Sequence, residues 1–224
     1  MIRAILFDLD GTLLDRTSSL ELFLIQQYSR FAASLSQINR ELYVRTLLDL
    51  DNHGYVPKIE AYAQASELFR LGPDLGQALL DDFEAGFHGL AIPFPGMHEV
   101  LTLLSSMGLE MGLVTNGAIR SQRPKIEALK IGPYFRAILI SEEQGVRKPD
   151  AEIYRRAMLR LGSTPESTVF IGDHPTADIE GAARLGIKTI WKRNTCWPAP
   201  KQMDASIDGL AEIPPIVTNM NLAC

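Results

Sequence analysis

Five short runs of apolar residues stand out along the chain because they are continuous rather than alternating. A continuous run of this length is typical of a strand that is buried on both faces of a parallel sheet. We therefore expect five parallel strands. They are residues 2–8, 111–115, 137–141, 168–173 and 188–192.

The segments between these runs carry apolar residues at a spacing of three and four, which is typical of amphipathic helices. Glycine closes several of them, as is common where a helix ends. Alternation of strands and helices predicts a doubly wound α/β fold with a parallel sheet. The helical segments are residues 97–107, 119–129, 151–161 and 177–185.

Residues 17–91 break this alternation, because they contain helical spacing and no convincing strand. The segment 91–96, "AIPFPG", holds two prolines and a glycine and is typical of a linker. We therefore expect one domain from residues 1–16 and 92–224 and a second, all-helical domain from residues 17–91. The two chain crossings between them would form a hinge.

Composition excludes several classes of protein. The 224 residues carry a net charge of −5 with no block of like charge, which argues against a nucleic-acid or membrane-surface binder. No apolar run approaches the ~18–20 residues that span a bilayer, and Asp8 interrupts the first run too early for a signal peptide. Cys196 and Cys224 match no metal-binding spacing. We expect a cytoplasmic protein, monomeric or homodimeric.

Polar side chains gather where the predicted strands end. In an open α/β sheet, ligands bind at the carboxyl ends of the strands. Each cluster has an ordinary interpretation by itself, as a turn, a helix cap or a surface lysine. Their joint placement at four strand ends favours a functional site. The residues are Asp8, Asp10, Gly11, Thr12, Thr115, Asn116, Gly117, Lys148, Asp173 and Asp178.

The residue types in these clusters suit phosphoryl transfer. Asp8 and Asp10 are two residues apart, so an extended backbone projects them to the same side. Asp8 is placed to attack phosphorus and form an aspartyl-phosphate. Asp10 is placed to protonate the leaving oxygen and then to deprotonate the attacking water. Gly11 permits a sharp turn close to the phosphate, and we include Gly11 and Thr12 among the candidate substrate contacts.

Several carboxylates near a phosphate require a cation. Asp8, Asp173 and a backbone carbonyl offer the hard oxygen ligands that suit Mg²⁺, and we include Asp10 and Asp178 in the expected metal site. Lys148 offsets the remaining negative charge. The Thr115 hydroxyl and the backbone at Asn116 and Gly117 are candidates for holding phosphate oxygens.

These motifs, taken in order, resemble the haloacid dehalogenase superfamily. They are "DLDGT" at 8–12, "VTNG" at 114–117, Lys148 in "RKPD" and "GDHPTAD" at 172–178. The resemblance implies a three-layer core with strand order 5-4-1-2-3 and a helical C1 cap between the first two motifs. It implies a contact of Asp178 with metal-bound water or lysine.

The resemblance favours the phosphatase branch, near members such as phosphoglycolate phosphatases and pyrimidine 5'-nucleotidases. Dehalogenases of the superfamily lack the second aspartate, which is present here as Asp10. We predict a Mg²⁺-dependent phosphomonoesterase acting on a sugar phosphate, a phosphoglycolate-like ester or a nucleoside monophosphate. A phosphomutase of the β-phosphoglucomutase type and a non-catalytic binding or regulatory protein of the same fold remain alternatives.

The stretch "LDNHGYVPK", residues 50–58, is the polar loop of the helical insert. His53, Tyr55 and Lys58 offer hydrogen-bond donors, so they are candidate contacts to a small phosphorylated substrate. An ordinary helix–helix turn around Asn52 and Gly54 is the competing interpretation.

Overall fold

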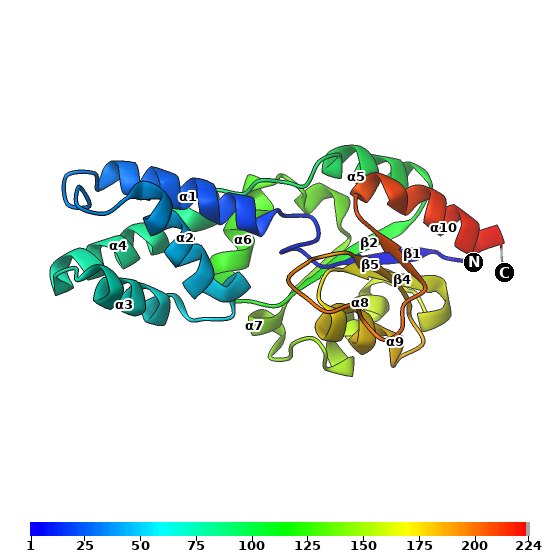
Figure 1. Ribbon diagram of the computed structural model, residues 1–224. Helices are drawn as coiled ribbons and strands as arrows, with labels where there is room; N and C mark the ends of the chain where they lie inside the picture. The colour runs from blue at the N-terminus through cyan, green and yellow to red at the C-terminus, as the bar shows by residue number, and fades with distance from the viewer. Residues whose placement is uncertain (223–224) are drawn as a thin grey trace. The chain divides into compact units, whose positions relative to one another are not determined.

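The computed structural model describes residues 1–222 and separates into two compact units. One unit comprises Met1–Asp15 and Pro93–Cys224, and the other comprises Arg16–Ile92 (Figure 1). Cys196 is an exposed free thiol, whereas Cys224 lies outside the described residues. None of the helices in the described part of the chain is both long enough and apolar enough to span a membrane.

The first unit is built on a parallel sheet. Among the described residues its order is β3-β2-β1-β4-β5-β6. The α/β class is confirmed, and the expected order of five strands is found within it. The strands are β1 (Ala4–Phe7), β2 (Glu110–Thr115), β3 (Ala137–Ile140), β4 (Thr168–Gly172), β5 (Lys188–Lys192) and β6 (Ala205–Ile207).

The prediction of five strands was wrong by one, because β6 extends the sheet beyond β5. This strand has three residues, and only Ile207 is buried. A run of this length and exposure gives no continuous apolar signal, so its pairing with β5 depends on the rest of the sheet.

Helices cover both faces of this sheet (Figure 1). On one face, apolar residues of α8 pack with Leu6 and Phe170 in a continuous buried core. The segment Pro175–Glu180 is a π-helix that continues into α9, where the sequence predicts one α-helix over 177–185. The helices are α5 (Met97–Ser106), α6 (Ile119–Ala128), α7 (Ser141–Gln144), α8 (Ala151–Leu161), α9 (Gly181–Ala183) and α10 (Ile213–Leu222).

The second unit is all helical, with α1 (Arg16–Arg30), α2 (Arg40–Asp51), α3 (Lys58–Phe69) and α4 (Pro73–Gly86). Its core is rich in aromatic side chains, and Phe83 packs edge to face with Phe23 and tilted against Tyr62. Gln27 is fully buried in this core and accepts hydrogen bonds from Tyr43 and Tyr62 at 2.7 and 2.8 Å. The buried polar group is thereby satisfied.

The two chain crossings between the units lie side by side. Within the sheet unit, Leu14 forms an antiparallel bridge with Pro93, and the Phe94 N–H donates to the Leu13 carbonyl at 2.9 Å. Within the helical unit, the Ile92 N–H donates to the Ser19 hydroxyl at 2.9 Å. Each unit therefore holds the entering and leaving chain together.

Candidate active site

Three buried carboxylates meet at the carboxyl ends of β1 and β4, which are adjacent strands. Asp8 follows β1 and still donates its N–H to the Ile171 carbonyl at 2.9 Å. Asp173 follows β4, and Asp178 lies in the π-helix. Each of the three offers an oxygen within 4.8 Å of the others. Their exposure is 6, 7 and 1%, so water does not solvate these charges.

Lys148 partly compensates this negative charge. Its Nζ lies 2.6 Å from Asp8 Oδ1 and 2.7 Å from Asp178 Oδ1. Burial by itself lowers the pKa of Lys148, but the carboxylates of Asp178 and Asp8 outweigh burial and hold the pKa above its usual value. Lys148 is therefore an ammonium group, and it supplies a single positive charge to three acids.

The remaining negative charge shows in the pKa values of two aspartates. Burial, with the charges of neighbouring acids, raises the pKa of Asp8 well above its ordinary value. Burial, followed by the charge of Asp178, raises the pKa of Asp173 to about 7. A hard divalent cation prefers carboxylate oxygens and would relieve this repulsion. The donor set therefore fits such a cation.

The turn after β1 requires glycine at position 11. Gly11 has φ of +86°, and a Cβ there would lie 2.3 Å from Asp173 Oδ2. Any side chain would displace this carboxylate. The sequence predicts that Gly11 lets the backbone approach a phosphate, and the structure adds this close approach of Asp173 as a reason for glycine. Thr12 is fully buried and donates its hydroxyl to Asp8 Oδ2 at 3.3 Å.

The residues after β2 are largely occupied by contacts within the protein. The Asn116 amide donates to the Lys148 carbonyl at 3.0 Å and accepts the Lys148 N–H at 2.9 Å. The Gly117 N–H donates to the Ser141 hydroxyl at 2.9 Å. Asn116 therefore fixes the backbone that carries the buried lysine. Substrate contacts of Thr115, Asn116 and Gly117 stay a prediction.

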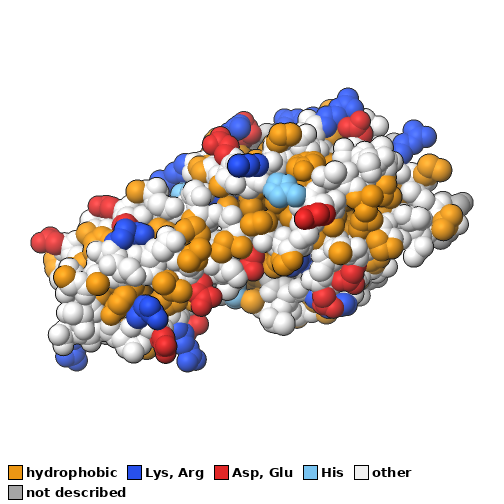
Figure 2. Space-filling model, turned by 90° about the horizontal axis from the view of Figure 1, so that it is seen from above, with side chains coloured by type: hydrophobic (Ala, Val, Ile, Leu, Met, Phe, Trp, Pro, Cys, Tyr) orange, Lys and Arg blue, Asp and Glu red, His pale blue; other side chains and the backbone are white. Residues whose placement is uncertain are grey.

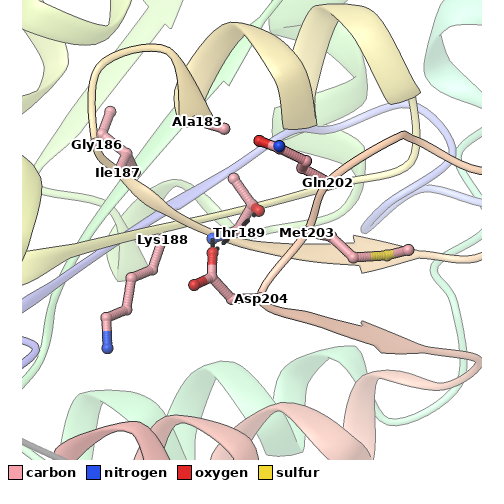
Figure 3. A pocket seen from close by; sticks show the side chains of 8 residues that line it. All are labelled: Ala183, Gly186, Ile187, Lys188, Thr189, Gln202, Met203 and Asp204. Atoms are coloured by element: carbon pink, nitrogen blue, oxygen red, sulfur yellow. Dashed lines mark hydrogen bonds between the residues drawn. The ribbon is translucent and has the colours of Figure 1, made fainter.

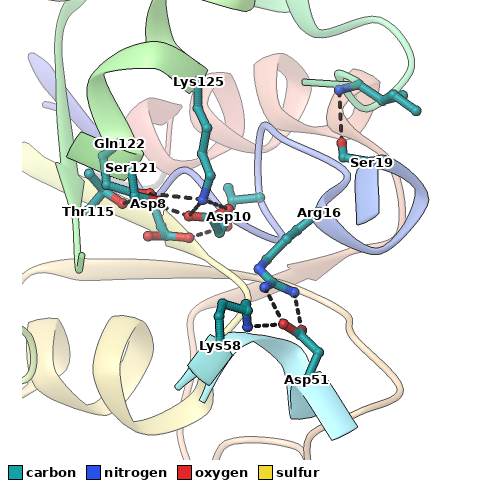
Figure 4. A network of polar contacts seen from close by, with 12 residues as sticks. Asp8, Asp10, Arg16, Ser19, Asp51, Lys58, Thr115, Ser121, Gln122 and Lys125 are labelled. Atoms are coloured by element: carbon teal, nitrogen blue, oxygen red, sulfur yellow. Dashed lines mark hydrogen bonds and ion pairs between the residues drawn. The ribbon is translucent and has the colours of Figure 1, made fainter. Parts of the chain in front are cut away.

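Asp10 has different partners from the three carboxylates of the acidic group. Its carboxylate accepts hydrogen bonds from Lys125 and Gln122, both on α6 (Figure 4). The group of three carboxylates found in the described residues does not include that of Asp10. A place for Asp10 in the metal site stays a prediction.

Sequence reasoning missed several partners of the site residues. Gln122 and Lys125 are three positions apart and therefore lie on the same face of one helix, which is the only feature of the sequence that links them. The Asn194 amide donates to Asp173 Oδ2 at 2.7 Å, and no pattern in the sequence indicates this contact. His174 has a structural role, because its Nδ1 accepts the N–H groups of Thr176 and Ala177 and so caps the π-helix.

The polar loop of the helical unit is organised around a buried acid. Arg16 donates to both oxygens of Asp51 at 2.5 and 2.9 Å, and Lys58 also donates to Asp51. Burial by itself raises the pKa of Asp51, but the two cations outweigh burial and lower it. His53 and Tyr55 are exposed beside this cluster. Substrate contacts of His53, Tyr55 and Lys58 stay a prediction.

Two surface features lie outside this chemistry. A cavity of about 270 Å³ opens near the amino end of β5, where the Thr189 N–H donates to Asp204 Oδ2 at 2.8 Å (Figure 3). It lies at the opposite end of the sheet from the carboxylates. The face in Figure 2 intersperses acidic and basic side chains and shows no block of one sign.

A doubly wound parallel sheet with a lysine-bridged group of acids at its carboxyl edge is typical of α/β enzymes that bind their ligands at the carboxyl ends of the strands. The family model of haloacid dehalogenase-like hydrolases matches residues 5–192, and the chain belongs to this family. The resemblance in the sequence is thereby confirmed, and the chain is a hydrolase.

Similar proteins come from several lines of this family. A glyceraldehyde 3-phosphate phosphatase of Methanocaldococcus jannaschii is 28% identical, over 98% of this chain and 99% of the relative. The pyrimidine 5'-nucleotidase PynA of Streptococcus pneumoniae is 30% identical, over 84% of this chain and 82% of the relative. The crystal structure of a 2-haloacid dehalogenase from Pseudomonas syringae pv. tomato is also similar. It has a TM-score of 0.62 and 26% identity, and covers 98% of this chain and 99% of that chain.

Proposed function

We propose that the chain is a phosphatase that hydrolyses small phosphate monoesters through an aspartyl-phosphate on Asp8. The observation that carries this proposal is the buried Asp8 carboxylate, held by Lys148 and Thr12 beside two further acids. A nucleophilic carboxylate needs this fixed orientation and a positive environment for its phosphoryl group. The two curated relatives described above are phosphatases with different substrates, which supports the reaction and leaves the substrate open.

The reaction balances in two half-reactions. In the first, an Asp8 oxygen forms a bond to phosphorus, the bond from phosphorus to the ester oxygen breaks, and Asp10 gives its proton to that oxygen. In the second, water attacks phosphorus and gives a proton to Asp10. The bond to Asp8 then breaks, releasing inorganic phosphate and restoring both aspartates.

Mg²⁺ is the cation that we propose for the acidic group, held through Asp8 and Asp173. When bound, it would neutralise charge that develops on the transferred phosphoryl group. Asp178 holds the ammonium of Lys148 beside Asp8, so the lysine stays oriented in the absence of substrate. This contact is one of the two roles that the family resemblance implies for Asp178.

Asp10 favours ester hydrolysis over dehalogenation. A halide leaves without a proton, whereas an alkoxide is a poor leaving group unless it is protonated. Asp10 is held within the site by Lys125 and Gln122, as a proton donor requires. A phosphomutase would use the same residues, and it would return phosphate to the substrate instead of releasing it.

The metal is tested by measuring free phosphate from a panel of phosphate esters. We expect an excess of chelator to abolish release and Mg²⁺ to restore it. Asp173→Asn should raise the Mg²⁺ concentration for half-maximal activity by roughly 100-fold or more, since it removes a ligand. The control Asp204→Asn lies near the amino end of β5, at the opposite end of the sheet from the carboxylates, and should keep the Mg²⁺ requirement of the wild type. Full activity in chelator would refute the metal-dependent mechanism.

For selectivity, we propose that the helical unit contributes contacts through His53, Tyr55 and Lys58. Single alanine variants should change kcat/KM for individual esters by a few-fold to about a hundredfold, and so change the ranking of esters in the panel. This range follows from the ~0.5–3 kcal/mol of a hydrogen bond to a neutral or charged group. Gln77→Ala, on the exposed surface of α4, serves as the control. An unchanged ranking in all three variants would show that the loop only connects two helices and does not contact the substrate.

A further inference from the structure

We propose that Lys125 and Gln122 are positioning residues that hold the carboxyl group of Asp10 in the orientation for proton transfer to the leaving group. This inference rests on the proposed phosphatase function and assigns a role to two side chains of α6. Neither residue belongs to the four sequence motifs of the site.

The contacts between α6 and Asp10 involve both carboxylate oxygens. Lys125 Nζ lies 2.8 Å from Asp10 Oδ1 and 3.0 Å from Oδ2, and Gln122 Nε2 lies 2.8 Å from Oδ2. Figure 4 shows the side chains of Lys125 and Gln122 converging on Asp10. A carboxylate held at both oxygens by two side chains is restricted to one rotamer.

Exposure is distributed unequally within this cluster. The Asp10 side chain is 23% exposed, whereas that of Lys125 is 6% exposed. Gln122 is 1% exposed. The acid is therefore partly accessible to solvent, whereas the two groups that hold it are buried. A lysine this deeply buried is costly unless it is paired, and its ion pair here is with Asp10.

Gln122 connects Asp10 to the end of β2. Its Nε2 also donates to the Thr115 hydroxyl at 2.5 Å, and its Oε1 accepts from Lys125 Nζ at 2.9 Å. Both amide protons and the amide oxygen are therefore engaged, which fixes the orientation of the amide. One side chain thus sets the spacing between the proposed proton donor and a predicted phosphate contact.

Precise placement matters more for Asp10 than for most surface acids. Proton transfer needs the donor within hydrogen-bond reach of the leaving oxygen, and an error of about 1 Å can cost on the order of 100-fold in rate. Asp10 comes from a turn after β1, which by itself does not restrict the side chain. The helix α6 supplies this restriction.

The experiment compares two substrates that differ in their need for a proton. The leaving group of 4-nitrophenyl phosphate departs without a proton. The leaving group of an alkyl phosphate needs one. We expect Lys125→Met and Gln122→Met to lower kcat/KM on the alkyl ester, which reports the first half-reaction, about tenfold or more, up to the ~10²–10⁴-fold that general acid catalysis contributes. Their kcat/KM on the nitrophenyl ester should fall less than about threefold, with KM little changed for both. Lys125→Arg should recover part of the loss.

A double-mutant cycle separates positioning from a structural role. Adding Lys125→Met to Asp10→Asn should cause no further loss, because the group to be positioned is gone. Arg123→Met, an exposed position on the same helix, should behave as the wild type on both esters. Circular dichroism checks that each variant folds. If Lys125→Met does not fold, the same cycle is measured with Gln122→Met.

Three results would overturn the inference: equal losses of kcat/KM on both esters, a rise in KM that indicates direct binding of phosphate, or an additive loss in the Asp10→Asn background. Failure of the proposed function gives a different result. In that case the wild-type protein with Mg²⁺ would release no phosphate from either ester, or Asp8→Asn would retain wild-type activity.

Discussion

An Asp8→Asn variant is expected to lose turnover by on the order of 10⁴–10⁶-fold while remaining folded. The amide keeps the shape of the carboxylate but lacks the negative oxygen that attacks phosphorus, and loss of a covalent nucleophile has effects of this size. Phosphate release under Mg²⁺ saturation measures the loss. Retention of more than a few per cent of wild-type turnover would show that the attacking group lies elsewhere.

Stability gives an independent signature of the same variant. Burial raises the pKa of Asp8, so the ionised carboxylate at neutral pH disfavours the folded state. Replacing it with a neutral amide removes this cost, and Lys148 keeps its ion pair with Asp178. We therefore expect the melting temperature in chelator to equal or exceed that of the wild type. A large decrease would indicate that Asp8 stabilises the fold instead of serving chemistry.

Lys148→Met is expected to have the second large effect, on stability and on turnover together. The substitution leaves the carboxylates of Asp8 and Asp178 buried without their ammonium partner, and breaking such a pair costs about 3–5 kcal/mol. Denaturant unfolding in chelator measures this cost. Turnover should fall about 10²–10³-fold, because an oriented positive group near the phosphoryl oxygens is lost.

Metal affinity should move in the opposite direction in this variant. Removing one positive charge makes the acidic group more negative, so Mg²⁺ should bind more tightly by calorimetric titration even though turnover falls. The exposed Lys201→Met is the matched control and should change neither property. Weaker Mg²⁺ binding in Lys148→Met would contradict the assignment of Lys148 as the counter-charge of these carboxylates.

Among the three buried lysines described in the sheet unit, Lys125 and Lys148 divide between the two aspartates of the first motif. Lys148 contacts Asp8, and Lys125 contacts Asp10. Asp8 and Asp10 are two residues apart, yet their cations come from different parts of the chain, the loop before α8 and the helix α6. The nucleophile and the proposed proton donor therefore have separate environments, as their different tasks require.

The sequence by itself determined the α/β class, the positions of the first five strands and the placement of Asp8 and Asp173 at one edge of the sheet. The physical reason is that continuous apolar runs mark buried parallel strands, and the carboxyl ends of parallel strands meet at one edge. Asp8 and Asp173 are far apart in the chain, but topology alone brings them together once β1 and β4 are neighbours. Helical spacing likewise predicted the helices of residues 16–92.

Only the tertiary structure decided which side chains hold the site residues. Lys125 and Asp10 are separated by 115 positions, and Asn194 and Asp173 by 21. Such contacts depend on how a helix rotates against the sheet and how far a side chain reaches, and neither is encoded in a local pattern. For Asn116, the motif predicts a backbone contact to phosphate, and only the structure shows that its side-chain amide holds the backbone of Lys148. The local pattern sets which residues reach the site, and packing sets what each of them contacts there.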